Sequence, residues 1–243
     1  MDNLIWLGRR TAYLGRFRDA ISIFTRGIEK FPKDARMYRH RGHRFITLRR
    51  FNLACDDLLK AANLVKDKTD QVEPDGIPNA RGIPVSTLHS NIWYHLGLAS
   101  YLLKDYATAR FAYEKCLEVS RLDDNYVSTG HWLYMTLRLL NKEPEAEQLL
   151  ENVSKDMDII ENHHYHDLLL MYKGEITPEK LLEHARKEGS LSLSTIGYGI
   201  ANWFIYNDRK EQARDLLEEI LALESWASFG YIAAEVALRD IGR

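Results

Sequence analysis

Histidine is the residue type of this 243-residue sequence that could most directly carry chemistry. His163, His164 and His166 form one cluster, and His40 and His43 lie three positions apart. Histidine transfers protons near neutral pH and binds metals, but zinc needs three or four ligands that converge on one point. Adjacent histidines point about 100° apart on a helix, and neither cluster contains cysteine. We therefore expect no metal site and no cofactor.

Arginine is concentrated near the beginning of the chain. Residues 1–66 hold 15 Lys+Arg and 6 Asp+Glu, whereas residues 67–243 hold 18 and 29, so the formal net charge of −2 conceals a basic segment. Six arginines fall within 15 residues: Arg36, Arg39, Arg41, Arg44, Arg49 and Arg50. Two interpretations stay open. The arginines form a solvated helix surface, or they attract an anionic partner such as an acidic peptide, a phosphate or the acidic half of another copy.

Several classes of function lack support. The sequence contains no nucleophile elbow, phosphate loop, zinc-protease helix or dinucleotide fingerprint, so no catalytic residue is expected. Nucleic acid is not expected as a partner, because the whole chain is acidic and carries no nucleic-acid-binding motif. No run of 18 apolar residues is present, so no membrane span is expected. Cys55 and Cys116 are expected to be free and buried.

The elements that position these side chains follow a repeat of 34 residues. Each copy has a glycine, an alanine twelve positions later and a large apolar residue four positions after that: Gly8, Ala20 and Phe24; Gly42, Ala54 and Leu58; Gly97, Ala109 and Tyr113. Apolar residues also recur at i, i+3, i+4 and i+7, which predicts amphipathic helices. A period in this range is typical of stacked helix–turn–helix units, in which the glycine and the alanine would allow two helices to approach closely.

These motifs resemble the tetratricopeptide repeat (TPR) family, most clearly in three places: Leu4-x-x-Leu7-Gly8, Tyr38-x-x-Arg41-Gly42 and Trp93-x-x-Leu96-Gly97. The resemblance covers nearly the whole chain and implies an all-α, right-handed superhelical solenoid of about six repeats plus a C-terminal capping helix. One domain, 1–243, with about 13 helices is expected. The fifth repeat is expected to have its first helix at roughly 161–173 and to begin its second helix at Pro178.

The resemblance also implies that the first helix of each unit lines a concave groove. Residues one and five positions after the opening residue of the motif, with their neighbours, would point into it. This selects the candidate partner-binding residues, which are aromatic, histidine, arginine and asparagine: Arg9, Arg39, His40, His43, Tyr94, His95, His131, Trp132, Tyr165, Tyr198 and Asn202. Such residues concentrate binding energy at interfaces, and arginine pairs with carboxylates and phosphates. The alternative is that some of these aromatic residues only pack between repeats.

An insertion interrupts the repeat. The distance from Gly42 to Gly97 is 55 residues, and the extra residues fall at about 67–88. This segment contains three of the six prolines and the apolar residues Ile77, Ile83 and Val85. Long loops are usually functional or disordered. The insertion therefore either packs on the concave opening between the second and third units, or is a flexible linker.

Two functions stay open. The first is a non-catalytic scaffold that holds a protein or peptide segment in the concave groove, with an acidic segment among the candidates. The second is a small-molecule-binding protein or an enzyme, whose His- and aromatic-lined pocket the 67–88 insertion would close. No targeting segment is recognisable, so we expect a soluble chain that is cytoplasmic or exported with its leader removed.

Overall fold

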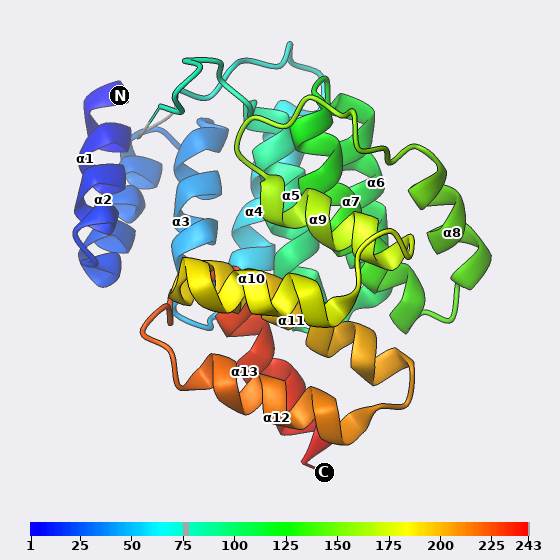
Figure 1. Cartoon of the computed structure of the whole chain (residues 1–243). Coiled ribbons are helices and arrows are strands. Elements are labelled where there is room, and N and C mark those ends of the chain that lie inside the picture. Colours follow the sequence, from blue (N-terminus) through cyan, green and yellow to red (C-terminus); the bar gives the residue numbers. More distant parts are fainter. Residues whose placement is uncertain (75–77, 243) are drawn as a thin grey trace. The chain divides into compact units, whose positions relative to one another are not determined.

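The computed structural model describes residues 1–74 and 78–242, and this part of the chain contains thirteen α-helices (Figure 1). They are α1 (Asp2–Tyr13), α2 (Phe17–Lys30), α3 (Ala35–Thr47), α4 (Phe51–Val65), α5 (Leu88–Leu102), α6 (Tyr106–Val119), α7 (Asp123–Leu139), α8 (Glu143–Glu151), α9 (His163–Tyr172), α10 (Pro178–Glu188), α11 (Ser190–Tyr206), α12 (Lys210–Leu221) and α13 (Phe229–Ile241). The prediction of an all-α fold is confirmed. None of these helices is both long and apolar enough to span a membrane.

The helices belong to two compact units. Unit 1 comprises Met1–Arg121 and contains α1 to α6, and unit 2 comprises Leu122–Arg243 and contains α7 to α13. The expectation of one continuous solenoid domain over 1–243 concerns the arrangement of the two units, and it stays a prediction.

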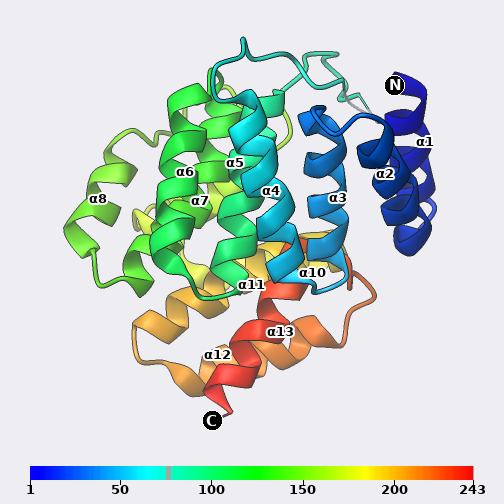
Figure 2. The same ribbon diagram turned by 180° about the vertical axis from the view of Figure 1, so that it is seen from behind.

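Unit 1 consists of three helical hairpins and the insertion. Helix α1 packs on α2, α3 on α4 and α5 on α6, and the contacts of α2 with α3 and of α4 with α5 join the hairpins (Figure 2). The first helices also contact one another in series, α1 with α3 and α3 with α5. The surface that α1, α3 and α5 form together is called the inner face below. Their side chains are therefore brought onto one face although they are far apart in the sequence.

Glycine brings the two helices of each hairpin unusually close. A β-carbon on Gly97 would lie 2.5 Å from the Tyr113 ring, and one on Gly42 would lie 2.9 Å from Cγ of Leu58. The predicted close approach is confirmed, with a correction to the partner. The space above each glycine is taken chiefly by the large side chain and not by the alanine four positions earlier, although the carbonyl oxygen of Ala54 lies 3.4 Å from the Gly42 position. The alanine lies within the same contact and is fully buried in all three hairpins.

Unit 2 continues the hairpin pattern with α7 and α8 and with α11 and α12, and α13 packs on α11 and α12. Helix α9 packs mainly on α7 and α11 and touches α10 only slightly, whereas α10 packs on α11. The predicted positions of the fifth repeat are confirmed: α9 lies within 161–173, and α10 begins at Pro178. The connection between α8 and α9 is held by the fully buried Asp124 of α7. Its Oδ1 accepts hydrogen bonds from the backbone N–H groups of Ile160, Glu161 and Asn162 at 2.7, 2.8 and 3.1 Å.

The close crossing at Gly97 predicts a loss of stability in the Gly97→Ala variant. Its new β-carbon would overlap the Tyr113 ring, so we expect a loss of about 1–3 kcal/mol. Gly130→Ala is a matched control, because Gly130 is also buried in a helix but its β-carbon would find its nearest neighbour at 3.7 Å. The better helix propensity of alanine should leave this variant unchanged or up to about 1 kcal/mol more stable. Thermal unfolding followed by circular dichroism measures both, and equal shifts would contradict the crossing.

Candidate binding site on the inner face of unit 1

The candidate site begins with basic side chains of α3. This helix starts after Asp34, whose carboxylate caps it by accepting a hydrogen bond from the backbone N–H of Arg36 at 3.1 Å. The cap sets where α3 begins, and Arg39 and His40 then lie on its buried side with exposed fractions of 8% and 5%. His40 also stacks on the Phe24 ring at a centroid distance of 5.5 Å. A buried guanidinium is strongly destabilising unless an anion pairs with it.

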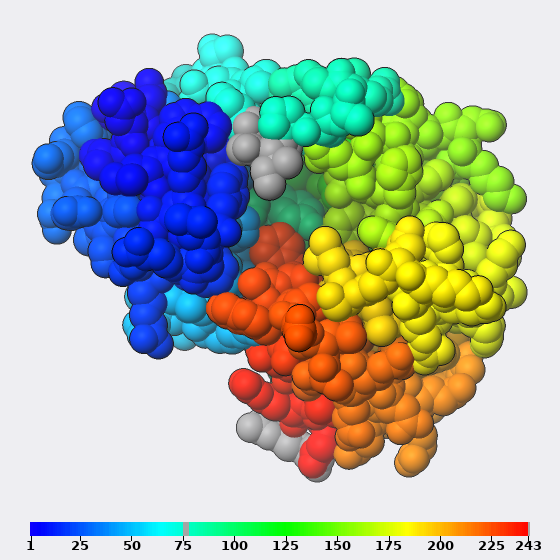
Figure 3. Space-filling model, turned by 60° about the vertical axis from the view of Figure 1, so that its left-hand side comes forward, coloured from blue at the N-terminus to red at the C-terminus, as the bar shows by residue number. Residues whose placement is uncertain are grey.

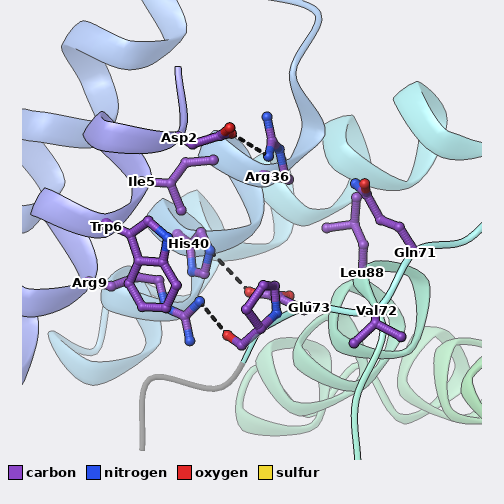
Figure 4. Close-up of a pocket in the computed structure, with 11 residues that line it drawn as sticks. Asp2, Ile5, Trp6, Arg9, Arg36, His40, Gln71, Val72, Glu73 and Leu88 are labelled. Carbon is purple, nitrogen blue, oxygen red and sulfur yellow. Dashed lines mark hydrogen bonds and ion pairs between the residues drawn. The ribbon is translucent and has the colours of Figure 1, made fainter. Parts of the chain in front are cut away.

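The insertion supplies that anion. The carboxylate of Glu73 lies 3.0 Å from Nε2 of His40 (Figure 4). The same carboxylate lies 3.2 Å from Nε of Arg39, and it is itself only 7% exposed. It also accepts a hydrogen bond from Nδ2 of Asn91, on α5, at 2.9 Å. One carboxylate from the insertion is thus held by side chains of α3 and α5.

The proton on His40 follows from its neighbours. Nη1 of Arg39 lies 2.9 Å from Nδ1 of His40, and a guanidinium can only donate. Nδ1 must therefore accept, so the proton of the neutral ring sits on Nε2, which faces Glu73. Burial lowers the pKa of His40 to about 4 although Glu73 opposes this change, so the ring is neutral at pH 7. Burial alone would raise the pKa of Glu73, but Arg39 and His40 outweigh it and hold that pKa well below its usual range.

A second contact reaches the insertion from α1. Nη1 of Arg9 donates a hydrogen bond to the backbone carbonyl of Pro74 at 2.7 Å, and the same guanidinium lies 4.5 Å from the ring centroid of Trp6 (Figure 4). Beside these contacts, a cavity of about 290 Å³ lies between α1, α3 and the insertion. Figure 3 shows the insertion next to the N-terminal helices on one face of unit 1.

The segment of the insertion around Glu73 therefore packs on the inner face. An isolated antiparallel bridge joins Val72 to Thr87 just before α5, and the contacts with the helices reach α1, α3 and α5. Polar contacts of the segment around Glu73 hold it there, rather than the apolar residues that the sequence suggested. Val85 is buried and Ile83 is half-buried, whereas Ile77 lies outside the described residues.

The other predicted residues of unit 1 form a group of rings beside this site. The rings of His43 and His95 lie 4.3 Å apart, and Tyr94 meets His95 edge-on at 5.5 Å. Nδ1 of His95 donates to the carbonyl oxygen of Asn91 at 2.6 Å. Burial, together with nearby arginines, lowers the pKa of both histidines well below the usual value, so both are neutral. Burial and then Arg39 also lower the pKa of Arg44 to about 10.

The predicted residues of unit 2 lie in its packed interior. Tyr165 is half-buried. The other four are no more than 2% exposed: His131, Trp132, Tyr198 and Asn202. The ring of His131 stacks on Tyr165 at 5.1 Å and on Tyr172 at 5.9 Å, and Trp132 stacks on Tyr198 at 5.8 Å. The structure thus brings these residues together as an aromatic cluster. Their burial favours the alternative interpretation, packing between repeats.

Two side chains of the site escaped prediction. Glu73 lies in a loop, where no periodicity places a side chain, and Asn91 precedes the motif that begins at Trp93. The one signal for Glu73 was an acidic residue between valine and proline, in an insertion of a chain whose beginning is rich in arginine. The histidines of α9 do not converge: His164 lies 2.8 Å from Glu188, and His166 contacts the carbonyl oxygen of Ser154. Cys55 and Cys116 are free, with Cys116 buried and Cys55 half-buried.

Comparison with known proteins identifies the repeat. Residues 90–122 match the family model of the tetratricopeptide repeat, which corresponds to the hairpin of α5 and α6. Two solved structures of nearly identical TPR-like repeats, from a putative kinesin light chain of Podosopora anserina, share 13% identity with TM-scores of 0.52 and 0.51. They cover 91% of this chain and 92% and 93% of those chains.

YrrB, a TPR protein with an unusual peptide-binding site, aligns over 97% of this chain and 90% of that chain at 13% identity, with a TM-score of 0.48. No curated protein sequence matched. At these identities the kinesin light chain structures show the repeat fold and nothing about a ligand.

The buried His131 predicts a pH dependence of stability. Burial lowers its pKa from 6.5 to about 3, so the unfolded chain binds this proton more readily than the folded one. The neutral His131 ring therefore makes its full contribution to the free energy of unfolding above pH 6.5. This contribution is lost as the pH falls towards 3, by up to about 1.4 kcal/mol per pH unit. His131→Phe keeps a ring for the stack with Tyr165 and Tyr172 and removes the titrating group. We expect this variant to lose less stability on acidification than the unmodified chain.

Urea unfolding at a series of pH values, from neutral to about pH 4, measures this difference. Leu191→Phe is the control, because it introduces the same residue at an exposed position and removes no titrating group, so it should leave the pH dependence unchanged. The other buried histidines, His40, His43 and His95, also have lowered pKa values, so every variant keeps part of the pH dependence of stability. An identical pH dependence in His131→Phe and in the unmodified chain would contradict the interpretation.

Proposed function

From the tetratricopeptide-repeat architecture of this chain, we propose that the protein is a non-catalytic interaction module that binds an acidic segment of a partner protein on the inner face of unit 1. One observation carries the proposal: basic and polar side chains of α1, α3 and α5 already hold an acidic peptide segment, the one that contains Glu73. The surface is therefore built for this chemistry.

The contacts match what an extended peptide presents. Arg39, His40 and Asn91 surround a carboxylate, and Arg9 donates to the backbone carbonyl of the next residue. A site that reads one acidic side chain and the adjacent carbonyl selects an extended segment rather than an isolated anion. The bonds of Asn91 to the carboxylate and of Arg9 to the carbonyl each involve one charged group, and charge-assisted hydrogen bonds are among the stronger polar contacts in proteins. The half-buried Trp6 adds flat apolar area at the edge of the site.

The charge balance favours an acidic partner. Among the described residues, Glu73 is the carboxylate within ion-pair distance of Arg39. No described carboxylate pairs with Arg9 or Arg44. These three arginines belong to neighbouring helices of the inner face, α1 and α3. Arg9 and Arg44 thus add positive charge to this face beyond what the described carboxylates pair. Such an excess attracts acidic segments over distances of about 10 Å at 0.1 M salt, and the attraction weakens as salt is added.

The second function, a pocket for a small molecule, has one observation in its favour. The cavity of about 290 Å³ beside Glu73 is lined by Trp6, Arg9 and His40, among others, and the insertion forms one of its walls. Its volume is at the lower limit of known ligand sites, which begin at about 300 Å³. The described lining residues include no serine, threonine, cysteine or lysine, and the carboxylates Asp2 and Glu73 are paired with arginines. We therefore favour the side chain of a bound peptide over a substrate as the occupant of the cavity.

Arg9 and Arg10 offer a matched test. Peptides would be selected from a random display library on the Glu73→Ala chain, in which the carboxylate site lacks its own glutamate. We expect the selected peptides to be enriched in aspartate and glutamate. Adding Arg9→Ala should weaken their binding by at least about tenfold, because a charged donor to the peptide backbone is lost. Adding Arg10→Ala removes the same charge from an exposed neighbouring position and should leave the affinity nearly unchanged.

Fluorescence anisotropy with the synthesised peptides measures these affinities at low and high salt. Binding to the Arg9→Ala chain should also depend less on salt than binding to the Arg10→Ala chain. Selection of peptides without acidic enrichment, or equal losses from the two arginine substitutions, would contradict the proposed function.

A further inference from the structure

We propose that residues Gln71–Pro74, called the anchor segment here, are an intramolecular ligand of the inner face, so that a partner binds by displacing them. This inference rests on the proposed function, because it assigns a regulator to the same site. The partner class is therefore an extended peptide that presents a carboxylate followed by a backbone carbonyl, as Glu73 and Pro74 do.

The anchor segment is held at its carboxylate rather than along its length. Glu73 is 7% exposed, whereas Gln71, Val72 and Pro74 are exposed, with Val72 at 57%. Glu73 contacts Arg39, His40 and Asn91 on the helices, and Arg9 adds the bond to the Pro74 carbonyl. An occupant attached at so few points buries little apolar area, so the free energy needed to open the segment locally comes mainly from separating Glu73 from Arg39 rather than from exposing apolar surface.

The attachment of the anchor segment to its own loop is also slight. Within the insertion, two backbone hydrogen bonds hold it: Glu73 N–H donates to Ser86 at 3.1 Å, and Leu88 N–H donates to Gln71 at 2.9 Å. Asp70, immediately before the segment, accepts from the backbone N–H of His89 at 3.0 Å. This bond ties the loop to the first turn of α5. Asp70 can therefore remain in place as a pivot while the residues after it leave the inner face.

Exchange with a partner solves the problem of the buried charge. Losing one member of a buried ion pair is strongly destabilising, because the remaining charge has no partner. If Glu73 left without a replacement, the guanidinium of Arg39 would lose its counter-ion and the fold would be destabilised. A carboxylate from a partner would take the same place beside Arg39, His40 and Asn91, so Arg39 stays paired throughout the bound state. The site is therefore closed to neutral peptides and open to acidic ones.

The covalent connection explains why a weakly attached segment can still compete. A ligand joined by a short flexible linker acts at an effective concentration of about millimolar. The anchor segment thus sets a threshold: partners of low affinity or low abundance do not displace it, whereas an acidic segment with further contacts along α1 and α3 does. Emptying the site should raise the affinity of every such partner by the same factor.

The test uses the anchor sequence as the probe. A fluorescently labelled peptide Thr-Asp-Gln-Val-Glu-Pro, residues 69–74, is titrated into four full-length chains: the unmodified protein, Glu73→Ala, a chain with Gly-Ser-Gly-Ser in place of residues 71–74, and the control Asp67→Ala. Asp67 is an exposed acidic residue of the same insertion. We expect both emptied chains to bind the peptide at least about tenfold more tightly than the unmodified chain and the control do.

Two further comparisons show that the peptide occupies the proposed site. Adding Arg39→Ala to the Gly-Ser chain should abolish binding, and a peptide with glutamine in place of glutamate should bind at least about tenfold more weakly. The Gly-Ser chain keeps the test decisive if Glu73→Ala does not fold, because the loop can then move away from the inner face as a whole.

The outcomes separate this inference from the proposed function. Equal affinity of library-selected acidic peptides for the unmodified and emptied chains would overturn the intramolecular ligand and leave the binding function standing. The same conclusion follows if the emptied chains bind library peptides but not residues 69–74. If no acidic peptide binds even the emptied chains, the proposed function itself is overturned.

Discussion

The inner face of unit 1 depends on one constraint: the guanidinium of Arg39 is buried and needs an anion. The repeat itself does not supply one, because α1 and α3 bring further arginines to the same face. The insertion does, through Glu73, whose carboxylate lies beside Arg39 and Nε2 of His40 and whose neighbour Pro74 accepts a hydrogen bond from Arg9. A charge that the helices leave unbalanced is thus the reason why a loop packs on them.

The repeat makes this constraint possible by controlling distance. Glycine at Gly42 and Gly97 lets each hairpin close tightly, and the first helices then lie in series. Side chains from α1, α3 and α5 can therefore meet at a single residue of the insertion. A larger side chain at these glycines would push apart the two helices of a hairpin and change the surface that those helices form.

Side chains at corresponding repeat positions find different kinds of partner in the two units. In unit 1 they carry Arg9, Arg39 and His40, whose charges and donors require a polar partner. In unit 2 they carry His131 and Trp132, whose rings find partners in Tyr165 and Tyr198 and are buried with them. The proposed binding surface therefore lies where the repeat positions are basic, because aromatic side chains satisfy one another whereas arginines cannot.

The sequence by itself determined the helices and their repeat, down to the start of α10 at Pro178 and the close approach at Gly42 and Gly97. These features follow from the helix preferences of individual residues and from the fixed spacing of the repeat, and both can be recognised in a single sequence. Only the tertiary structure decided that Glu73 occupies the inner face and that Trp132 is buried. Spacing predicts the direction of a helical side chain but not what lies opposite, and a loop carboxylate is placed by long-range charge pairing that leaves no periodic trace in the sequence.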